Sequence, residues 1–197
     1  MYCLTSDKKS WVYVCPGFLK SDEASFEEMM SERPGDRHVI QMFGKDVQLP
    51  RYTQSYGKDY SFSGAVSKSK PWIPVLEDIR DKTTIHLKKV LPEDTNVDFN
   101  MSLVNWYLSG DQYIGPHSDD ERPMVVGSPV ATLSWGSGRT FVIEPKKDQE
   151  GKKMTFEVKD GDLLVMGGSL QKTHKHSVPK TKTPVSTRIS FTFRVFR

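Results

Sequence analysis

His117 and Asp119, in the segment GPHSDDE, have the residue types and the spacing to bind a metal ion. On an extended segment, residues i and i+2 point to the same side, so the imidazole and the carboxylate can converge on one ion. A distant histidine would complete the set of two histidines and one carboxylate that leaves three positions open on one side of Fe(II). His174 and His176 can both fill that place, because they share a face of a β-prone stretch.

The C-terminal run VSTRISFTFRVFR separates polar from apolar side chains, as a strand with one buried face does. One face holds Arg188, Ser190, Thr192 and Arg194, and the other holds Ile189, Phe191, Phe193 and Val195. An arginine in a half-buried strand is costly unless an anion meets it, so the two guanidiniums predict a pocket for a carboxylate-bearing ligand. The alternative is a solvated sheet face. Because six residues of strand span roughly 20 Å, both side chains must lean inward to hold one small dianion.

Asn105 and Tyr107 share a strand face with Leu103 in the run SLVNWYLSG. An amide and a phenol hydrogen-bond well to a carboxylate or a carbonyl oxygen. These two side chains are therefore candidates for the same pocket.

Short β-rich runs separated by turn residues dominate the chain from residue 99 onward. The six runs are FNMSLVNWYL, SPVATLSW, RTFVIE, KMTFEV, DLLVM and VSTRISFTFRVF. This pattern of short strands and turns is typical of an antiparallel sandwich or barrel. Upstream, the sequence predicts strands at 11–15, 39–43 and 52–56, a helix capped by Ser21 over 22–31, and an amphipathic helix over 72–89. We expect an α+β fold with a jelly-roll-like core and two early helices on one face.

Composition excludes several classes of protein. Apolar residues make up 36% and aromatic residues 11% of the 197 residues, which is typical of a folded domain. No apolar run approaches the roughly 18 residues of a membrane span, and no secretory signal is recognisable. Cys3 and Cys15 are too few for a disulfide framework, so we expect reduced thiols in an intracellular protein. Nothing near His38 or His86 indicates a site.

Positive charge is concentrated in the C-terminal part of the chain. Residues 140–197 carry 12 Lys and Arg against 6 Asp and Glu, whereas the first 139 residues carry 16 against 19. This asymmetry favours a polyanionic partner, with a lysine-rich solvated surface as the alternative.

Several motifs together resemble the AlkB branch of the Fe(II)- and 2-oxoglutarate-dependent dioxygenases. They are NWY, GPHSDDE, HSVP and RISFTFR, preceded by LPRYTQSYGKDYSFSG and KPWIPVLEDIRD. The resemblance covers roughly residues 36–197. It implies a double-stranded β-helix core at 99–197, and an N-terminal extension at 1–98 with helices, a β-hairpin and a nucleotide-recognition lid, in one compact domain.

The resemblance also implies the ligands of the metal and of the co-substrate. Fe(II) would be bound by His117, Asp119 and His176, with O2 and 2-oxoglutarate as co-substrates. Arg188 would hold the distal carboxylate of 2-oxoglutarate with help from Tyr107. Asn105, Thr192 and Arg194 would line the rest of that pocket or lie near its keto-acid end.

On the substrate side, the resemblance implies that a nucleobase is flipped out of the stack into the site. Phe62 would stack on this base opposite His117, beside Tyr60 and Ser61, and Asp120 and Glu121 would read its edge and its positive charge. Phe43, with Gly44 and Lys45, would form a finger that fills the gap in the helix, and Arg51 would contact DNA. A core phenylalanine beside a turn is the alternative for Phe43.

The implied function is oxidative demethylation of N1-methyladenine and N3-methylcytosine in duplex or single-stranded DNA. We expect the protein to act as a monomer without a membrane partner. We expect it in the nucleus if the organism is a eukaryote, and otherwise in the cytoplasm. The segment Thr181-Lys182-Thr183 replaces a basic run of the duplex-specific branch, so Lys146, Lys147, Lys152 and Lys153 are the other candidate phosphate contacts. Three alternatives stay open: the same chemistry on RNA or on a protein side chain, a non-catalytic lesion-binding module, and a metal-binding jelly roll with unrelated chemistry.

Overall fold

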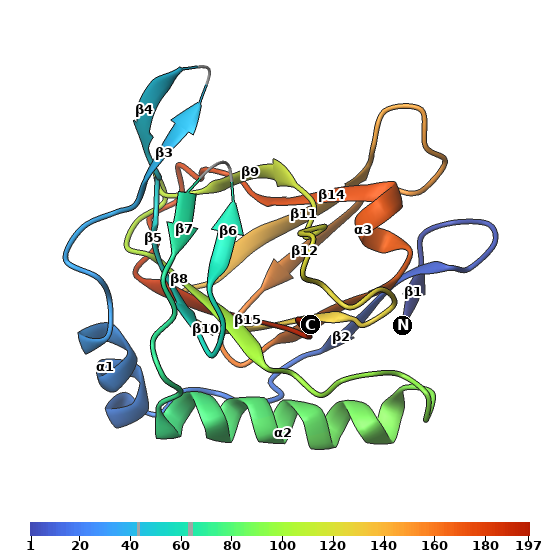
Figure 1. Cartoon of the computed structure of the whole chain (residues 1–197), viewed down its shortest axis with the longest axis horizontal. Helices are drawn as coiled ribbons and strands as arrows, with labels where there is room; N and C mark the ends of the chain where they lie inside the picture. Colours follow the sequence, from blue (N-terminus) through green and yellow to red (C-terminus); the bar gives the residue numbers. More distant parts are fainter. Residues whose placement is uncertain (43, 63–64) are drawn as a thin grey trace.

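Two antiparallel sheets make up most of this computed structural model, which describes residues 1–42, 44–62 and 65–197 (Figure 1). The fold is a mostly β, α+β arrangement with few helices. In spatial order, the seven-stranded sheet contains β1 (Tyr2–Cys3), β2 (Ser10–Cys15), β13 (Leu163–Gly168), β10 (Val130–Gly136), β15 (Arg188–Arg194), β8 (Met101–Tyr107) and β5 (Tyr52–Tyr56). The four-stranded sheet contains β12 (Met154–Val158), β11 (Arg139–Pro145), β14 (His174–Val178) and β9 (Ile114–His117).

The central strand β15 confirms the predicted separation of polar and apolar faces. It lies between β8 and β10, and Thr192 is the partner of both Leu103 and Thr132. Ile189, Phe191 and Phe193 are fully buried in the main hydrophobic cluster. The opposite face, with both arginines, lines a cavity and is buried as well.

Helix α2 (Pro74–Val90) runs along the outer side of the large sheet (Figure 1). Its buried residues, Leu76, Ile79, Thr83 and Leu87, follow the three- and four-residue spacing of an amphipathic helix. Burying this stripe removes apolar surface from water and stabilises the layer by about 25 cal/mol per Å².

Helix α1 (Glu23–Ser31) begins one residue later than predicted, because its cap is Asp22 and not Ser21. The Asp22 carboxylate accepts a hydrogen bond from the Ser25 backbone N–H at 2.8 Å. The Ser21 hydroxyl instead donates to Asp160 at 2.9 Å. A carboxylate at this position also favours the positive end of the helix dipole.

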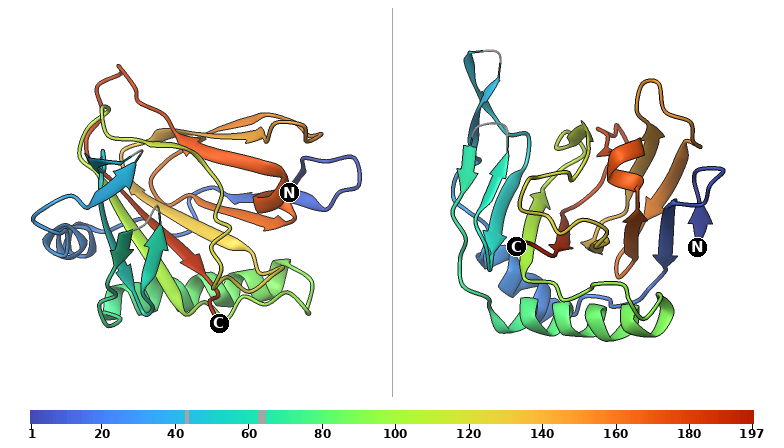
Figure 2. Two further views of the ribbon diagram at one scale, coloured as in Figure 1. Left: turned by 45° about the horizontal axis from the view of Figure 1, so that its top comes forward. Right: turned by 45° about the vertical axis from the view of Figure 1, so that its right-hand side comes forward.

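Two small hairpins stand beside the sheets on the side of the cavity (Figure 2). They are β3 (Val39–Met42) with β4 (Lys45–Gln48), and β6 (Tyr60–Phe62) with β7 (Ala65–Ser67). Side chains from both hairpins line the cavity. The short helix α3 (Leu170–Thr173) leads directly into β14.

The two parts of the chain that we predicted to divide at residue 98 share one sheet. Strands β2 and β5 precede this boundary, and they pair with β13 and β8, which follow it. The division into residues 1–98 and 99–197 stays a prediction. The large sheet contains strands from both parts. Among the described residues, none of the helices combines the length and the apolar character that a bilayer span requires.

Candidate metal and co-substrate site

The two candidate histidine ligands meet across a pair of strands. His117 ends β9 and His176 lies in β14, and the two are register partners. Asp119 follows β9 by two residues and is 1% exposed. One ligand atom of each of the three residues lies within 4.8 Å of the others, which matches a facial site of two histidines and one carboxylate.

The orientation of both imidazoles suits a metal ion. His117 Nε2 lies 3.7 Å from Asp119 Oδ1, and His176 Nε2 lies 3.7 Å from Asp119 Oδ2. The other ring nitrogen of His117, Nδ1, is 2.9 Å from the Gly115 carbonyl oxygen, so it donates its proton there and leaves Nε2 free. Asp119 Oδ2 is buried without a hydrogen-bond partner, as expected of an atom that a cation would satisfy.

Burial and neighbouring charge keep the ligands in their metal-binding protonation states. Burial lowers the pKa of His176 to about 3, and it also lowers the pKa of His117. Burial alone would raise the pKa of Asp119, but Arg194 and the two imidazoles hold it below its ordinary value. Neutral imidazoles and an ionised carboxylate are the forms that bind a metal ion.

The structure separates the two histidines that strand periodicity left as alternatives. His176 faces Asp119, whereas the Nδ1 atom of His174 lies 2.7 Å from the Thr173 hydroxyl oxygen. His174 is fully buried and lies outside the cavity lining.

Arg188 has the surroundings of an anion-binding residue. It is 1% exposed, and its Nη2 atom donates to the Ser134 hydroxyl at 2.8 Å. Its Nε and Nη1 atoms are buried without partners, and the guanidinium lies 5.3 Å from the centre of the Tyr107 ring. Burial lowers the pKa of this guanidinium. A buried charge without a counter-ion is costly, so an anion beside it would be favourable. A carboxylate in the cavity would satisfy both free donors.

Arg194 lies at the other end of the same strand face, beside the metal ligands. Its Nη2 atom is 2.8 Å from Asp119 Oδ1, and its guanidinium is 5.1 Å from the centre of the Tyr60 ring. Both predicted arginines thus face the cavity rather than solvent, but from opposite ends. Among the described residues, Arg188 has two buried nitrogen atoms without a partner, whereas Arg194 is paired with a metal-ligand candidate and has one such atom, Nε.

The remaining predicted co-substrate residues line the wall between the two arginines. Asn105 Oδ1 accepts a hydrogen bond from Arg51 Nε at 2.8 Å, and both residues are buried. The Thr192 hydroxyl lies 3.3 Å from that of Thr132. Arg51, predicted to contact DNA, is buried and lines the cavity wall, and its DNA contact stays a prediction.

These residues enclose one cavity of about 700 Å³. It extends from Arg188 past the three metal-ligand candidates to the two small hairpins. Its lining includes every predicted metal and co-substrate residue and the predicted base-pocket residues Tyr60, Ser61, Phe62, Asp120 and Glu121.

At the hairpin end of the cavity, two aromatic rings lie beside a half-buried carboxylate. The Tyr60 and Phe62 ring centres are 5.3 Å apart, and the Tyr60 hydroxyl donates a hydrogen bond to Glu121. Glu121 Oε2 is buried without a hydrogen-bond partner, and burial raises the pKa of this carboxyl. Asp120 is exposed, with its carboxylate 3.5 Å from Lys146 Nζ.

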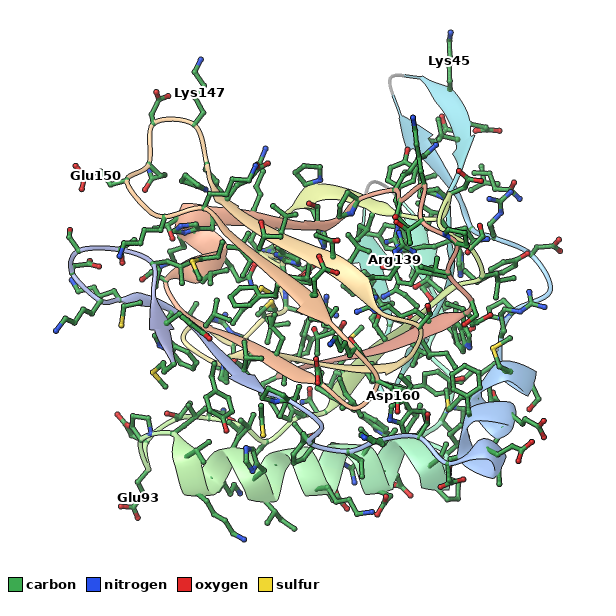
Figure 3. The ribbon with its side chains drawn as sticks, turned by 180° about the vertical axis from the view of Figure 1, so that it is seen from behind. Lys45, Glu93, Arg139, Lys147, Glu150 and Asp160 are labelled. Carbon is green, nitrogen blue, oxygen red and sulfur yellow. The ribbon has the colours of Figure 1, made fainter. Side chains whose placement is uncertain are left out.

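Gly44 and Lys45 lie at the exposed turn between β3 and β4, and Phe43 falls outside the described residues. Gly44 has a φ of 75°, a conformation that glycine adopts more readily than other residues. Lys45 projects from the same side of the molecule as Lys147, at the opposite end (Figure 3).

Sequence reasoning missed Arg139, which is buried behind Tyr107. Its guanidinium donates to the carbonyl oxygens of Ser109, Gln112 and Pro179 at 3.2, 2.8 and 2.7 Å. It therefore fixes two loops beside the co-substrate end and adds positive charge near Arg188. The sequence did contain a signal for its burial: the alternation of RTFVIE places Arg139 on the same strand face as Phe141.

Comparisons with known proteins agree with this geometry. A family model described as the 2OG-Fe(II) oxygenase superfamily matches residues 11–194. The DNA oxidative demethylase ALKBH2 of Homo sapiens is 39% identical over 191 residues, which cover 90% of this chain and 69% of the relative. ALKBH2 of Bos taurus is 37% identical, with 90% and 65% covered. The chain thus spans roughly two thirds of the length of these relatives.

A solved structure of OsALKBH1 has the same fold, with a TM-score of 0.62 and 19% sequence identity. The match covers 93% of this chain and 96% of that one. The fold, the paired histidines with their carboxylate and the sequence relatives lead to one conclusion: the chain belongs to the AlkB family of the 2OG-Fe(II) oxygenase superfamily.

Proposed function

We propose that the protein is an Fe(II)- and 2-oxoglutarate-dependent dioxygenase that removes methyl groups from nitrogen atoms of nucleobases in DNA, with N1-methyladenine and N3-methylcytosine as substrates. The observation that carries the proposal is one cavity that joins the metal ligands, a buried guanidinium with two nitrogen atoms unpaired among the described residues, and an aromatic pocket with a half-buried carboxylate. The relatives named DNA oxidative demethylase support the choice of substrate.

At the co-substrate end, Arg188 would bind the distal carboxylate of 2-oxoglutarate through its free Nε and Nη1 atoms. Tyr107 and Thr192 would border that carboxylate, and Asn105 and Arg194 would lie toward the keto-acid end. When bound, the iron and 2-oxoglutarate supply the oxidising chemistry that hydroxylates an N-methyl group, after which the product loses formaldehyde.

The chain's own contribution is to position the reactants and to exclude water. His117, Asp119 and His176 would hold the metal ion on one side of the cavity and leave the side toward the substrate open. The buried walls keep the reacting methyl group away from bulk water, and the fixed geometry replaces a bimolecular encounter with an oriented contact.

The base-binding end suits a base that carries a positive charge. Phe62 and Tyr60 offer ring surfaces, which attract cations, and the free Glu121 Oε2 atom offers a charge partner. Methylation at N1 of adenine or N3 of cytosine creates such a charge and blocks pairing, which eases extrusion of the base. A cationic base would also lower the raised pKa of Glu121 and so favour its ionised form.

Delivery of the base would involve the β3–β4 hairpin and the loop between β11 and β12. Phe43, which lies outside the described residues, would enter the helix stack, with Gly44 and Lys45 beside it. Arg51 would contribute from the cavity wall, and Lys147, Lys152 and Lys153 would contact phosphates. The proposal has two further parts. The two sheets form the double-stranded β-helix core of the family, and the protein acts inside the cell.

The direct test is to incubate the purified protein with Fe(II), 2-oxoglutarate, O2 and an oligonucleotide that carries one N1-methyladenine or N3-methylcytosine. We expect the oligonucleotide to lose the mass of one CH2 unit, and formaldehyde and succinate to appear in equal amounts. Parallel reactions with single-stranded DNA, duplex DNA and RNA compare the substrate classes. Succinate formation without loss of mass from any DNA would favour RNA or a protein side chain as the substrate.

A further inference from the structure

Asp119 lies in a segment that strand pairing does not hold. Strand β9 ends at His117, and residues 118–120 have no regular secondary structure. His117 and His176, by contrast, are fixed against each other as register partners of β9 and β14. The position of the carboxylate ligand must therefore come from other contacts.

The backbone of Asp119 is hydrogen-bonded to one side chain of helix α3. Its N–H donates to Gln171 Oε1 at 2.9 Å. Because a backbone N–H can only donate, the amide atom that faces it is the oxygen. Among the residues that the structure describes, the other end of the same amide, Gln171 Nε2, meets only the weak acceptor Met166 Sδ at 3.7 Å. The bond to Asp119 is therefore the stronger contact of this side chain.

The residues on either side of Asp119 are tied to the same junction. The Ser118 hydroxyl donates to the His174 carbonyl oxygen at 2.8 Å. Lys146 Nζ lies 3.5 Å from Asp120 Oδ2 and donates to the Gln171 carbonyl oxygen at 2.9 Å. Helix α3 leads directly into β14, so the segment that carries Asp119 is attached to the element that carries His176.

We propose that Gln171 is a positioning residue that holds Asp119 at the distance from His176 that a metal ion requires. Its side chain lies on α3, three residues before β14 begins, and it reaches the peptide group of the carboxylate ligand. Asp119 Oδ2 and His176 Nε2 are 3.7 Å apart in this arrangement. The proposal depends on the metal site alone, and not on the identity of the substrate.

The test is the affinity for Co(II), measured without co-substrate or substrate by calorimetry and by the visible absorption of the bound ion. Gln171→Leu removes the acceptor and preserves most of the volume. Loss of an interaction that orients a metal ligand typically weakens metal affinity about 10- to 100-fold, and we expect a rise of that size in the Kd. Gln171→Glu keeps an acceptor oxygen, and its added negative charge favours a cation, so its affinity should equal or exceed that of the wild type.

Gln54→Leu is the matched control, because the Gln54 side chain also hydrogen-bonds to a backbone group away from the metal ligands: its Nε2 atom donates to the Lys68 carbonyl oxygen at 2.8 Å. Thermal unfolding shows that each variant is folded at the temperature of the titration. An unchanged Kd for Gln171→Leu, or an equal loss in Gln54→Leu, would overturn the proposal. If Gln171→Leu does not fold, Gln171→Glu decides: undiminished affinity supports the role, and weakened affinity contradicts it. Demethylation activity does not enter any of these outcomes.

Discussion

At the residue scale, the most unusual energetics belong to Arg188. Its side chain is buried, two of its nitrogen atoms have no partner, and among the described residues no carboxylate pairs with it. A buried cation without an anion destabilises the folded protein, because it has lost its hydration. The binding of a dicarboxylate would restore those interactions, so the same charge that costs stability in the free protein would stabilise the complex.

We therefore expect Arg188→Met to abolish the stabilisation by 2-oxoglutarate while leaving the free protein no less stable. A saturating ligand at 100 times its Kd stabilises a protein by about 2.7 kcal/mol, and the variant should lose this increment. Thermal unfolding with Mn(II), with and without 2-oxoglutarate, measures the difference. Arg122→Met, at an exposed arginine, is the control, and it should keep the increment. A full increment in Arg188→Met would remove this residue from the co-substrate site.

The buried histidine ligand should make the metal-free protein less stable in acid. The ordinary pKa of histidine is 6.5, and burial lowers that of His176 to about 3. Between these values the unfolded chain binds a proton at this residue and the folded chain does not. The free energy of unfolding therefore falls as the pH falls through this window.

We expect His176→Asn to reduce the slope of stability against pH, by up to about 1.4 kcal/mol per pH unit. Urea unfolding across the window, in the presence of a chelator, measures this slope. His38→Asn is the matched substitution, because His38 is half-buried and lies outside the cavity. Equal slopes in the wild type and His176→Asn would show that His176 does not carry the effect.

At the scale of elements, the β3–β4 hairpin reaches from the cavity wall into solvent. Ile40, on β3, is buried in the cavity wall, and Val47 lines the cavity from β4, although every residue of β4 is also exposed to solvent. The hairpin projects beyond the two sheets (Figure 1). The hairpin therefore has one part in the site and another free to meet a nucleic acid.

Phe43→Ala should impair repair of a duplex and spare repair of a single strand, because only a duplex has a gap to fill after extrusion of a base. The measurement is the demethylation rate on the same methylated sequence in both forms. Val39→Ala truncates an exposed apolar side chain of the same hairpin and should change neither rate. An equal loss on both substrates would rule out the finger role.

Elements with one buried face could be predicted from the sequence, whereas elements without a periodic pattern of apolar residues could not. The alternation in β15 and the spacing in α2 are direct consequences of one buried face, so both were predicted. Strand β4, with the sequence KDVQ, is fully exposed, and β9, with the sequence IGPH, contains glycine and proline. Neither has an alternating pattern, and each forms because a partner strand is placed beside it.

The same reasoning explains which site residues were predicted. His117 and Asp119 are neighbours in sequence, so their spacing indicated a shared ligand. Arg139 and Gln171 act on residues at least 27 positions away, so only the tertiary structure brings them to the site. Arg51 was predicted only as a DNA contact, and its bond to Asn105, 54 positions away, likewise appears only in the folded chain. The choice of His176 over His174 came from the family resemblance and not from the period of the strand.

At the scale of the whole molecule, exposed lysines lie at the β3–β4 hairpin and in the β11–β12 loop. Lys45 and Lys147 project from the same side (Figure 3). Lys146 is instead held within the protein by Asp120 and by the Gln171 carbonyl oxygen. Of the lysines in the β11–β12 loop, we therefore assign a phosphate contact to Lys147 rather than to Lys146.

Lys147→Gln should weaken binding of methylated DNA without regard to sequence and reduce the slope of log K against log salt by about 1. Fluorescence anisotropy over a series of salt concentrations measures both quantities. Lys89→Gln, at an exposed lysine near the C-terminal end of α2, is the control and should change neither. A slope that Lys147→Gln leaves unaltered would exclude Lys147 from the phosphate contacts.

The central claim is that one metal ion and one 2-oxoglutarate share the cavity between β9, β14 and β15. The most direct measurement is anomalous diffraction from crystals grown with Mn(II) and 2-oxoglutarate. We predict a metal peak bound by His117 Nε2, the Asp119 carboxylate and His176 Nε2, with the distal carboxylate of 2-oxoglutarate on Arg188. A metal peak at any other residues, or a 2-oxoglutarate that does not contact Arg188, would contradict the account.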